Sequence, residues 1–425
     1  MSNLEGALVG MIDRIAVLGG SSLYIPEFIA SILSHNLCVQ EVTLIGRTEA
    51  KLAIVAKFCQ RLADKSGFPL KITHTTDLAE GVRDAAFILN NIRVGGMSAR
   101  LRDEKMPPRF GLIGDETLGA GGIANGLRTL PVLFQIASTI EAAAPNAVMI
   151  NLTNPLGICM EGLTKYTQLK VVGICDLPET TIKKTIELLR LNGNDLVVDY
   201  IGLNHVGWIQ DIRVGGRSCM SRAIERILRE DDEFFERALV ELFRLIPVKP
   251  VHLFFYRDSV LKKQQALARF RAQELQEAEE QILALYADPH LNEIPALTRA
   301  RNAVWYRDTI VPLIKALSNK AEQQFILCTK NNGAIRDLPE DASVEVPAVV
   351  SQKGWVVQPV GSCPRFLKGL FISIKESDRL VVEAVRHRSY EYALQALAVH
   401  PLVGSLESAR AYLDQVIKDD NLELH

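Results

Sequence analysis

The chain has 425 residues, of which 48% are hydrophobic and 23% are charged, and its formal net charge is −2. This length is too great for one ordinary domain and suits two domains that share an interface. The nearly neutral charge gives no reason to expect a nucleic acid or an anionic membrane as a partner. No apolar run reaches the roughly 18 residues of a membrane span.

The first half of the chain alternates short β-branched runs with helical stretches. We expect helices at 24–36 and 49–67. The expected strands lie at 14–20, 41–47, 70–77, 85–92, 147–154 and 170–176. Strands that are buried on both faces and separated by helices predict an α/β fold with a Rossmann-like, doubly wound parallel sheet.

The second half has a different pattern. Apolar residues at helical spacing predict long amphipathic helices at 222–246 and 262–287, and a mixed segment at 325–350 precedes a helical end. We therefore expect a mixed α+β, largely helical C-terminal domain over 196–425, after an N-terminal domain over 1–195.

The start of the chain and its cysteines predict the compartment. The opening residues, MSNLEGALVGMIDR, include acidic side chains and lack a basic region followed by an apolar stretch, so we expect no secretory signal. The seven cysteines form no CxxC pair and no disulfide-like spacing. A reduced, cytoplasmic compartment is the expectation.

A glycine turn follows the first expected strand, where Gly19 and Gly20 precede Ser21 and Ser22. Such a turn lets backbone N–H groups at a helix N-terminus meet a diphosphate. The turn is not a full GxGxxG, and by itself it is equally compatible with an ordinary βα connection. Its place as the first βα turn of an α/β half favours dinucleotide binding.

The second expected strand ends in Gly46-Arg47-Thr48 and lacks the Asp or Glu that usually binds the adenosine ribose. An arginine at this place can bind a 2′-phosphate, which makes NADP an alternative to NAD. The other interpretation of Arg47 is a solvated arginine.

Further polar side chains follow the later strands of the predicted sheet. Arg93 follows the strand at 85–92, Asn151 and Asn154 end the strand at 147–154, and a glycine-rich segment at 114–128 contains Glu116. We expect the glycine-rich segment to be a loop that wraps a ligand. Any one of these features is more often a turn or a cap, but together at one sheet edge they predict a ligand cleft.

Cys175 and Asp176 end the strand at 170–176, and His205 follows about thirty residues later in GLNHVGW. A cysteine and a histidine can form a metal site or a nucleophile pair. Taken alone, the thiol is more readily explained as core filling, and the imidazole as a hydrogen-bonded structural group.

Together these segments resemble the NAD- and divalent-metal-dependent glycosidases of glycoside hydrolase family 4. The resemblance runs along nearly the whole chain, from VLGGSSLYIPE through GDETLGAGG, NLTNPLGI, GICDLP and GLNHVGW to HPLV. It implies a lactate or malate dehydrogenase-like domain that binds NAD over 1–195. The domain over 196–425 would then serve the substrate, the metal and assembly into a homodimer or homotetramer.

The resemblance also implies an exception to two-carboxylate glycosidase chemistry. NAD⁺ removes a hydride from C3 of the sugar, a base takes the acidified C2 proton, and Mn²⁺ or another divalent metal stabilises the resulting enediolate. The C1 oxygen then leaves, water adds, and the hydride returns. The substrate is a small phosphorylated sugar.

Roles for the metal and substrate residues follow from the resemblance alone. Cys175 and His205 correspond to the metal ligands. The implied substrate contacts are Arg93, Asn151 and Asn154. The candidate cofactor-binding residues Gly19, Gly20, Ser21, Ser22 and Arg47 come from their places after the first two strands, and Glu116 is added because it sits in a segment that resembles the family.

The chain departs from the family pattern at the base. The family usually carries Pro-Tyr-Leu-x-Tyr-Tyr, whereas this chain has KPVHLFFYRD, which puts Val251 at the base tyrosine. The candidate catalytic residues are therefore His252 or, after a register shift, Tyr256 as base, and Asp176 as the acid for the leaving group.

The substrate class has two interpretations. Asp176, after the cysteine, is the residue type of phospho-α-glucosidases, whereas the chain length and the GGSSLYIPE start are closer to the β type. We expect a glycosidase of 6-phospho-glucosides, similar to 6-phospho-β-glucosidases. The alternatives are a 6-phospho-α-glucosidase, an NAD(P)-dependent sugar or hydroxy-acid dehydrogenase, and a catalytically silent homologue that lacks the usual base.

Overall fold

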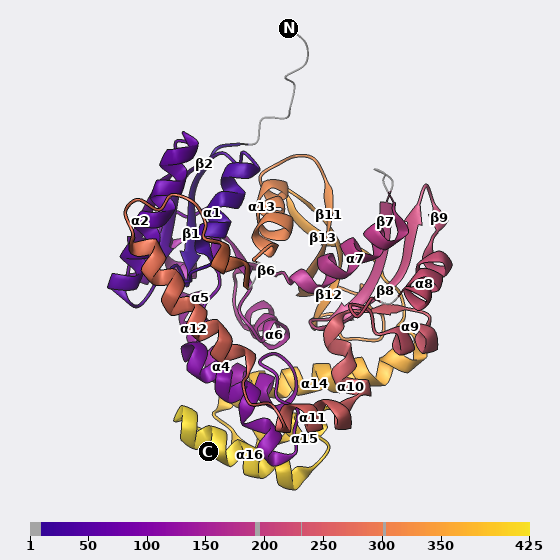
Figure 1. The fold of residues 1–425 in the computed structure, drawn as a ribbon. Helices are drawn as coiled ribbons and strands as arrows, with labels where there is room; N and C mark the ends of the chain where they lie inside the picture. The colour runs from indigo at the N-terminus through magenta and orange to yellow at the C-terminus, as the bar shows by residue number, and fades with distance from the viewer. Residues whose placement is uncertain (1–9, 192–195, 231, 301–302) are drawn as a thin grey trace.

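The computed structural model describes residues 10–191, 196–230, 232–300 and 303–425. The expected domain boundary at residue 195 lies outside these described residues, so it stays a prediction. The strands of the described residues form one 13-stranded sheet that runs through both halves of the chain (Figure 1).

The first half forms the parallel part of this sheet. Its strands are β1 (Ile12–Leu18), β2 (Val39–Ile45), β3 (Lys71–Thr75), β4 (Phe87–Asn90), β5 (Val148–Asn151) and β6 (Lys170–Gly173). They pair in the order β3-β2-β1-β4-β5-β6, which is the doubly wound Rossmann order. The predicted fold class is confirmed, and the strand order reverses beside β1, where such folds bind ligands.

Helices cover both faces of the parallel strands, because successive residues of each strand point to opposite sides. Ile15 and Val17 of β1 pack in one cluster with helices α1, α2, α12 and α13, and Ala16 and Leu18 pack in another with α3, α5 and α6. The helices that cover the first face span α1 (Ile25–Ser34), α2 (Glu49–Ser66), α12 (Arg271–Ala287) and α13 (Val311–Leu317). Those on the second face span α3 (Leu78–Val82), α5 (Gly119–Ala143) and α6 (Leu156–Tyr166).

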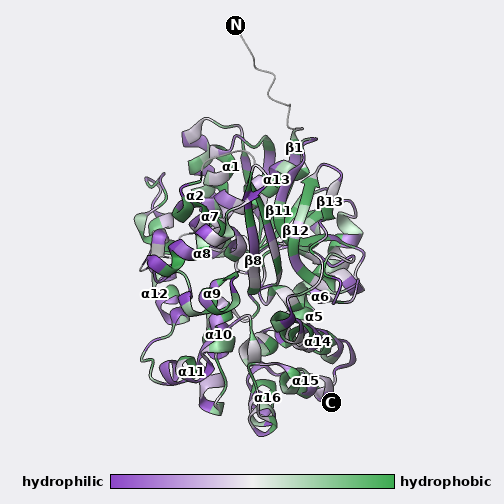
Figure 2. Ribbon diagram, turned by 90° about the vertical axis from the view of Figure 1, so that its right-hand side faces the viewer, coloured by the Kyte–Doolittle hydropathy of each residue, from purple (hydrophilic) through white to green (hydrophobic). Residues whose placement is uncertain are grey.

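The second half extends the same sheet with antiparallel strands. They are β7 (Leu196–Leu203), β8 (Val206–Val214), β9 (Arg217–Ser218), β10 (Ile246–Pro247), β11 (Gln323–Lys330), β12 (Ser343–Ser351) and β13 (Gly354–Val357). The parallel and antiparallel parts of the sheet join where the backbone of Cys328 in β11 pairs with that of Gly173 in β6. In Figure 2 hydrophobic residues gather on central strands such as β11 and β12, whereas peripheral helices such as α11 and α12 carry many hydrophilic residues.

The remaining helices lie at the periphery of the sheet. They are α4 (Gly96–Lys105), α7 (Asp176–Leu189), α8 (Met220–Arg229), α9 (Arg237–Phe243), α10 (His252–Phe255), α11 (Arg257–Gln265), α14 (Arg365–His387), α15 (Tyr390–Val399) and α16 (Leu406–Asp420). The last three pack near α5 at the C-terminal end of the molecule (Figure 1). Within the described ranges, no helix combines the length and apolarity that a membrane crossing needs.

Both long helices expected in the second half are interrupted. Instead of one helix over 222–246 there are α8 and α9, and instead of one over 262–287 there are α11 and α12. Local hydrogen bonds compete with the helix in each gap. Asp232 Oδ1 accepts from the backbone N–H of Phe234 at 2.9 Å, and Gln273 Oε1 accepts from the N–H of Phe270 at 2.9 Å.

The loop expected over 114–128 is largely helical, because α5 begins at Gly119. Its glycines serve close packing rather than flexibility. A Cβ atom on Gly121 would lie 2.3 Å from the carbonyl oxygen of Asp115 and 2.4 Å from that of Asp103. This end of α5 therefore tolerates no side chain at that position.

Candidate active site

Two cavities adjoin at the carboxyl end of the parallel strands. The larger, of about 660 Å³, lies over the β1–α1 turn and the end of β2. The smaller, of about 110 Å³, lies beside the ends of β5 and β6 and the β7–β8 turn. Asn91, the residue after β4, lines both cavities, so they form two compartments of one site.

The larger cavity is built on the predicted glycine turn. Gly19, Ser21 and Ser22 line it. Gly19 has φ +80, and a Cβ atom there would lie 2.4 Å from the carbonyl oxygen of Asn91, so only glycine fits. The Gly20 N–H donates to Ile45 O at 2.8 Å and holds the turn against β2. A long cavity above a glycine turn at the strand switch point fits a dinucleotide.

The far wall of this cavity comes from the end of β2 and the start of α2. Gly46, Arg47, Thr48 and Lys51 line it, and Glu279 of α12 is the carboxylate among the described lining residues. Arg47 therefore stands at the predicted ribose end of the cavity.

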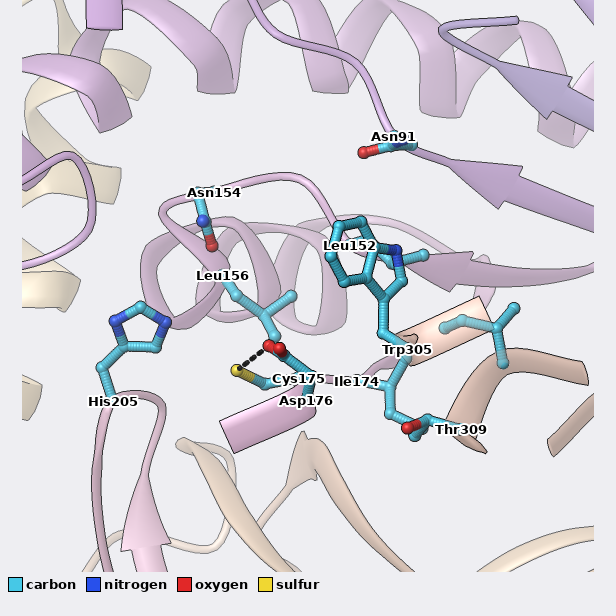
Figure 3. A pocket seen from close by; sticks show the side chains of 11 residues that line it. Asn91, Leu152, Asn154, Leu156, Ile174, Cys175, Asp176, His205, Trp305 and Thr309 are labelled. Atoms are coloured by element: carbon cyan, nitrogen blue, oxygen red, sulfur yellow. Dashed lines mark hydrogen bonds between the residues drawn. The ribbon is translucent and has the colours of Figure 1, made fainter. Parts of the chain in front are cut away.

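The smaller cavity brings Cys175 and His205 together from separate elements (Figure 3). Cys175 is the residue directly before α7, and His205 lies in the two-residue turn between β7 and β8. His205 has φ +65, an unusual conformation for a non-glycine residue that costs on the order of 1–3 kcal/mol. Its buried Nδ1 has no hydrogen-bond partner among the described residues. An unsatisfied imidazole nitrogen held under strain beside a thiol fits a ligand site.

Burial sets the protonation states of both side chains. Burial lowers the pKa of His205 to about 4, so its imidazole is neutral at neutral pH and able to bind a metal. Burial, with the negative charges of Asp176 and Glu345, raises the pKa of the Cys175 thiol, whereas a hydrogen bond from Asn204 acts in the opposite direction. A bound divalent cation would displace the thiol proton.

The chain itself supplies few metal ligands at this place. No three His, Cys, Asp or Glu side chains gather into a metal cluster in the described part of the chain. A cation held by Cys175 and His205 needs further ligands from a substrate or water.

Asp176 and Asn154 complete the polar lining of the smaller cavity. Asp176 Oδ1 lies 3.8 Å from the Sγ of Cys175, and Asn154 comes from the β5–α6 connection on the opposite side (Figure 3). Four of the predicted site residues thus face one cavity, although three separate connections supply them.

Arg93 and Glu116 form an ion pair at the edge of the larger cavity. Arg93 lines this cavity, and its Nη1 contacts Glu116 Oε2. Arg100 Nη1 lies 3.4 Å from the other oxygen of Glu116. Glu116 is absent from the described lining of both cavities, and its carboxylate pairs with Arg93 and Arg100.

Four other predicted residues are absent from the described lining of both cavities, and Gly20 of the glycine turn is one of them. Asn151 is buried between strands and accepts a hydrogen bond of 2.6 Å from Asn90. His252 lies on α10, with Nδ1 2.7 Å from Lys249 O. Tyr256 lies where α10 meets α11, and partial burial raises its pKa.

Several lining residues carry no signal that sequence reasoning could have used. Trp305, Thr309 and Ile310 reach the smaller cavity from the segment before α13. They carry no motif, and only the long-range fold brings them there. Asn91 could have been predicted from the sequence, because it lies at the end of the expected strand that Arg93 follows.

A buried carboxylate supports the turn that carries His205. Glu345 of β12 accepts hydrogen bonds from the Tyr200 hydroxyl at 2.6 Å and from Asn204 Nδ2 at 3.1 Å. Burial raises the pKa of Glu345 to about 7. Nothing in the local sequence SVEVP distinguishes this glutamate from a surface residue.

The sheet order, the glycine turn and the cavity above it define a Rossmann-type α/β enzyme. In agreement, malate dehydrogenase from Cryptosporidium parvum, 15% identical, superposes with a TM-score of 0.53 over 89% of this chain and 100% of that chain. This likeness shows the fold alone.

Sequence comparison gives the family. Residues 14–191 match the family described as family 4 glycosyl hydrolase, and residues 200–403 match its C-terminal domain. The chain belongs to glycosyl hydrolase family 4, and is thus a hydrolase of glycosidic bonds.

Relatives with both anomeric preferences resemble the chain. It is 32% identical to a probable 6-phospho-β-glucosidase of Bacillus subtilis, over 95% of this chain and 96% of the relative. The 6-phospho-β-glucosidase of Thermotoga maritima, solved with manganese, NAD⁺ and glucose 6-phosphate, has a TM-score of 0.90 at 29% identity, over 97% of this chain and 100% of that chain. A 6-phospho-α-glucosidase from gut microorganisms, solved with NAD and Mn²⁺, has a TM-score of 0.88 at 26% identity, over 97% of this chain and 100% of that chain.

Proposed function

We propose that this protein hydrolyses 6-phospho-glucosides, with a 6-phospho-β-glucosidase reaction as the leading form. One observation carries the proposal: the strained, neutral His205 and the thiol of Cys175 face a cavity that meets the dinucleotide cavity at Asn91. Relatives of both anomeric types act on 6-phospho-glucosides by their names, which supports the substrate class.

The cofactors in this proposal are NAD, with NADP as the alternative that Arg47 raises, and Mn²⁺ or another divalent metal. When bound, the dinucleotide accepts and returns the C3 hydride, and the metal polarises the neighbouring sugar oxygens. Cys175 and His205 would hold the metal. Gly19, Ser21 and Ser22 would cradle the diphosphate.

The other side chains act on the sugar directly. The Asp176 carboxylate lines the smaller cavity, where it would deliver a proton to the leaving glycosidic oxygen. Asn154 would bind sugar hydroxyls through its amide. Arg93, held in place by Glu116, would offer donors to the substrate from the edge of the adjoining cavity. Trp305 would exclude water from the smaller cavity.

For the C2 base, His252 and Tyr256 stay as proposals. Neither lines the smaller cavity among its described residues, whereas Asp176 does. Asp176 also favours the second candidate function, a 6-phospho-α-glucosidase, because this residue type follows the cysteine in the α enzymes that the chain resembles. Cytoplasmic location and a homodimer or homotetramer are part of the same proposal.

A panel of chromogenic 6-phospho-α- and 6-phospho-β-glucosides tests the proposal. Each substrate is supplied with NAD⁺ or NADP⁺, with and without Mn²⁺. We expect aglycone release that needs both the dinucleotide and the metal, with the β-glucoside as the faster substrate. Steady NADH or NADPH accumulation without aglycone release would instead establish a dehydrogenase. Ligand binding without turnover across the panel would establish a silent homologue.

A further inference from the structure

The ribose end of the larger cavity has an unusual composition for an NAD site. Strands β1 and β2 are parallel neighbours, with Leu18 opposite Ile45. A dinucleotide seated on the turn after β1 therefore places its adenosine ribose beside the residues after β2. Gly46, Arg47 and Thr48 are those residues, and all three line the cavity.

No carboxylate stands where an NAD site needs one. A site selective for NAD accepts hydrogen bonds from the ribose hydroxyls with an Asp or Glu after the second strand, and this charge repels a 2′-phosphate. Gly46 occupies the small space there, and a Cβ atom on it would lie 3.2 Å from Leu52 and 3.4 Å from Ser21. Residues 46–48 after β2 therefore offer no carboxylate to the ribose.

The acidic residues nearby have basic partners. Glu49 Oε1 lies 3.0 Å from His74 Nε2. Glu279, which lines the cavity from α12, lies 3.7 Å from Lys51 Nζ. Arg47, in contrast, is exposed and forms no hydrogen bond or ion pair with another described residue. The free positive charge at this end of the cavity is that of Arg47, with Lys51 close by.

We propose that the larger cavity binds a 2′-phosphorylated nicotinamide dinucleotide, NADP⁺, in preference to NAD⁺. The Arg47 guanidinium pairs with the 2′-phosphate, and the Thr48 hydroxyl is a further donor. Arginine is suited to this role because its planar fork matches phosphate oxygens. This inference rests on the proposed function, in which the cavity holds the dinucleotide.

Binding, rather than turnover, tests the preference. Calorimetry on the full chain measures the affinity of NAD⁺ and of NADP⁺, and then of the fragments 5′-AMP and 2′,5′-ADP, which isolate the ribose end. We expect NADP⁺ to bind about tenfold or more tightly than NAD⁺, since charge-assisted phosphate contacts are of this strength. The fragment 2′,5′-ADP is expected to exceed 5′-AMP by a similar factor.

Two variants test whether Arg47 causes the preference for NADP⁺. Arg47→Ala is expected to weaken NADP⁺ binding about tenfold and to leave the affinity for NAD⁺ within about twofold of the wild-type value. Lys57→Ala removes an exposed positive charge from α2, the helix that follows Arg47, at a position outside the described cavity lining, and is expected to change neither affinity. Thermal melts of both variants check that the fold is kept.

Each contrary result has a distinct meaning. NAD⁺ binding as tight as NADP⁺ or tighter overturns the inference and leaves the proposed function standing. An Arg47→Ala variant that weakens both cofactors equally also overturns it, because the effect is then not on the 2′-phosphate. If neither dinucleotide binds the wild-type chain, the proposed function fails and the inference fails with it.

Discussion

Asn204 donates a hydrogen bond of 3.1 Å to Glu345, and Asn204 directly precedes His205 in the turn between β7 and β8. The second oxygen of Glu345 accepts from the Tyr200 hydroxyl at 2.6 Å. Glu345 and Tyr200 are both buried, so the carboxylate ties β12 to the strand that carries the turn. The strained backbone of His205 is thus held by a residue more than a hundred positions away in the chain.

We expect Glu345→Gln to lower the affinity for Mn²⁺ about tenfold, because residues that orient metal ligands have effects of this size. The new amide would present N–H donors to groups that are themselves donors. Dinucleotide affinity should stay within about twofold, since the glycine turn is untouched. Calorimetric titration with Mn²⁺ measures the change, and Tyr200→Phe, which removes one hydrogen bond only, should have the smaller effect. A folded Glu345→Gln variant with wild-type metal affinity would refute the supporting role.

Cys175→Ser and His205→Ala are each expected to reduce Mn²⁺-dependent aglycone release by about a hundredfold or more, because each removes one of two proposed protein ligands. The melting temperature should remain close to that of the wild type. Cys219→Ser is the matched control, because Cys219 stands before α8 and is absent from the described lining of both cavities. Full activity in either ligand variant would exclude the metal assignment.

Deuterium exchange at C2 of the sugar separates the candidate proton-transfer residues. We expect Asp176→Asn to lower aglycone release about a hundredfold, because its carboxylate faces the smaller cavity. As a proposed C2 base, His252 predicts that His252→Ala lowers C2 exchange about a hundredfold. Unchanged exchange in His252→Ala would remove this histidine from the base role.

The buried imidazole of His400 makes stability depend on pH. Its Nδ1 accepts from the Leu402 N–H at 3.1 Å, and burial lowers its pKa to about 3. Below the ordinary histidine pKa of about 6.5 the unfolded chain binds a proton that the folded chain excludes, so the folded state loses about 1.4 kcal/mol per pH unit. This loss continues as the pH falls towards the folded pKa and is absent at higher pH.

Urea unfolding of wild type and His400→Asn across this acidic range measures that contribution. An Asn side chain can accept the Leu402 N–H but carries no titratable group. The variant should therefore show a slope of stability against pH that is smaller by about 1.4 kcal/mol per unit. Equal slopes for the two proteins would show that His400 is not the titrating group.

The sequence was informative where a residue directly follows a strand. The carboxyl ends of parallel strands meet at one edge, so the places of Asn154, Cys175 and Asp176 follow from strand order alone. The same rule places Arg93 and the Gly19 turn. The structure brings all five to the two adjoining cavities.

Features that depend on long-range packing could not be predicted from the sequence in this way. Glu116 lies in a segment that resembles the family, and the sequence does not show that its carboxylate forms an ion pair with Arg93. Trp305 reaches the cavity from a segment whose local pattern carries no chemistry. The glycine-rich segment at 114–128 suggests a loop that wraps a ligand, but α5 begins at Gly119, and Gly121 packs closely against neighbouring backbone.

Hydrolysis of a chromogenic 6-phospho-β-glucoside in D₂O, with dinucleotide and Mn²⁺ present, tests the central claim most directly. Oxidation at C3 and proton removal at C2 predict that the released glucose 6-phosphate carries deuterium at C2, with no net accumulation of reduced dinucleotide. Aglycone release that leaves C2 without deuterium, and that continues without dinucleotide, would contradict the account.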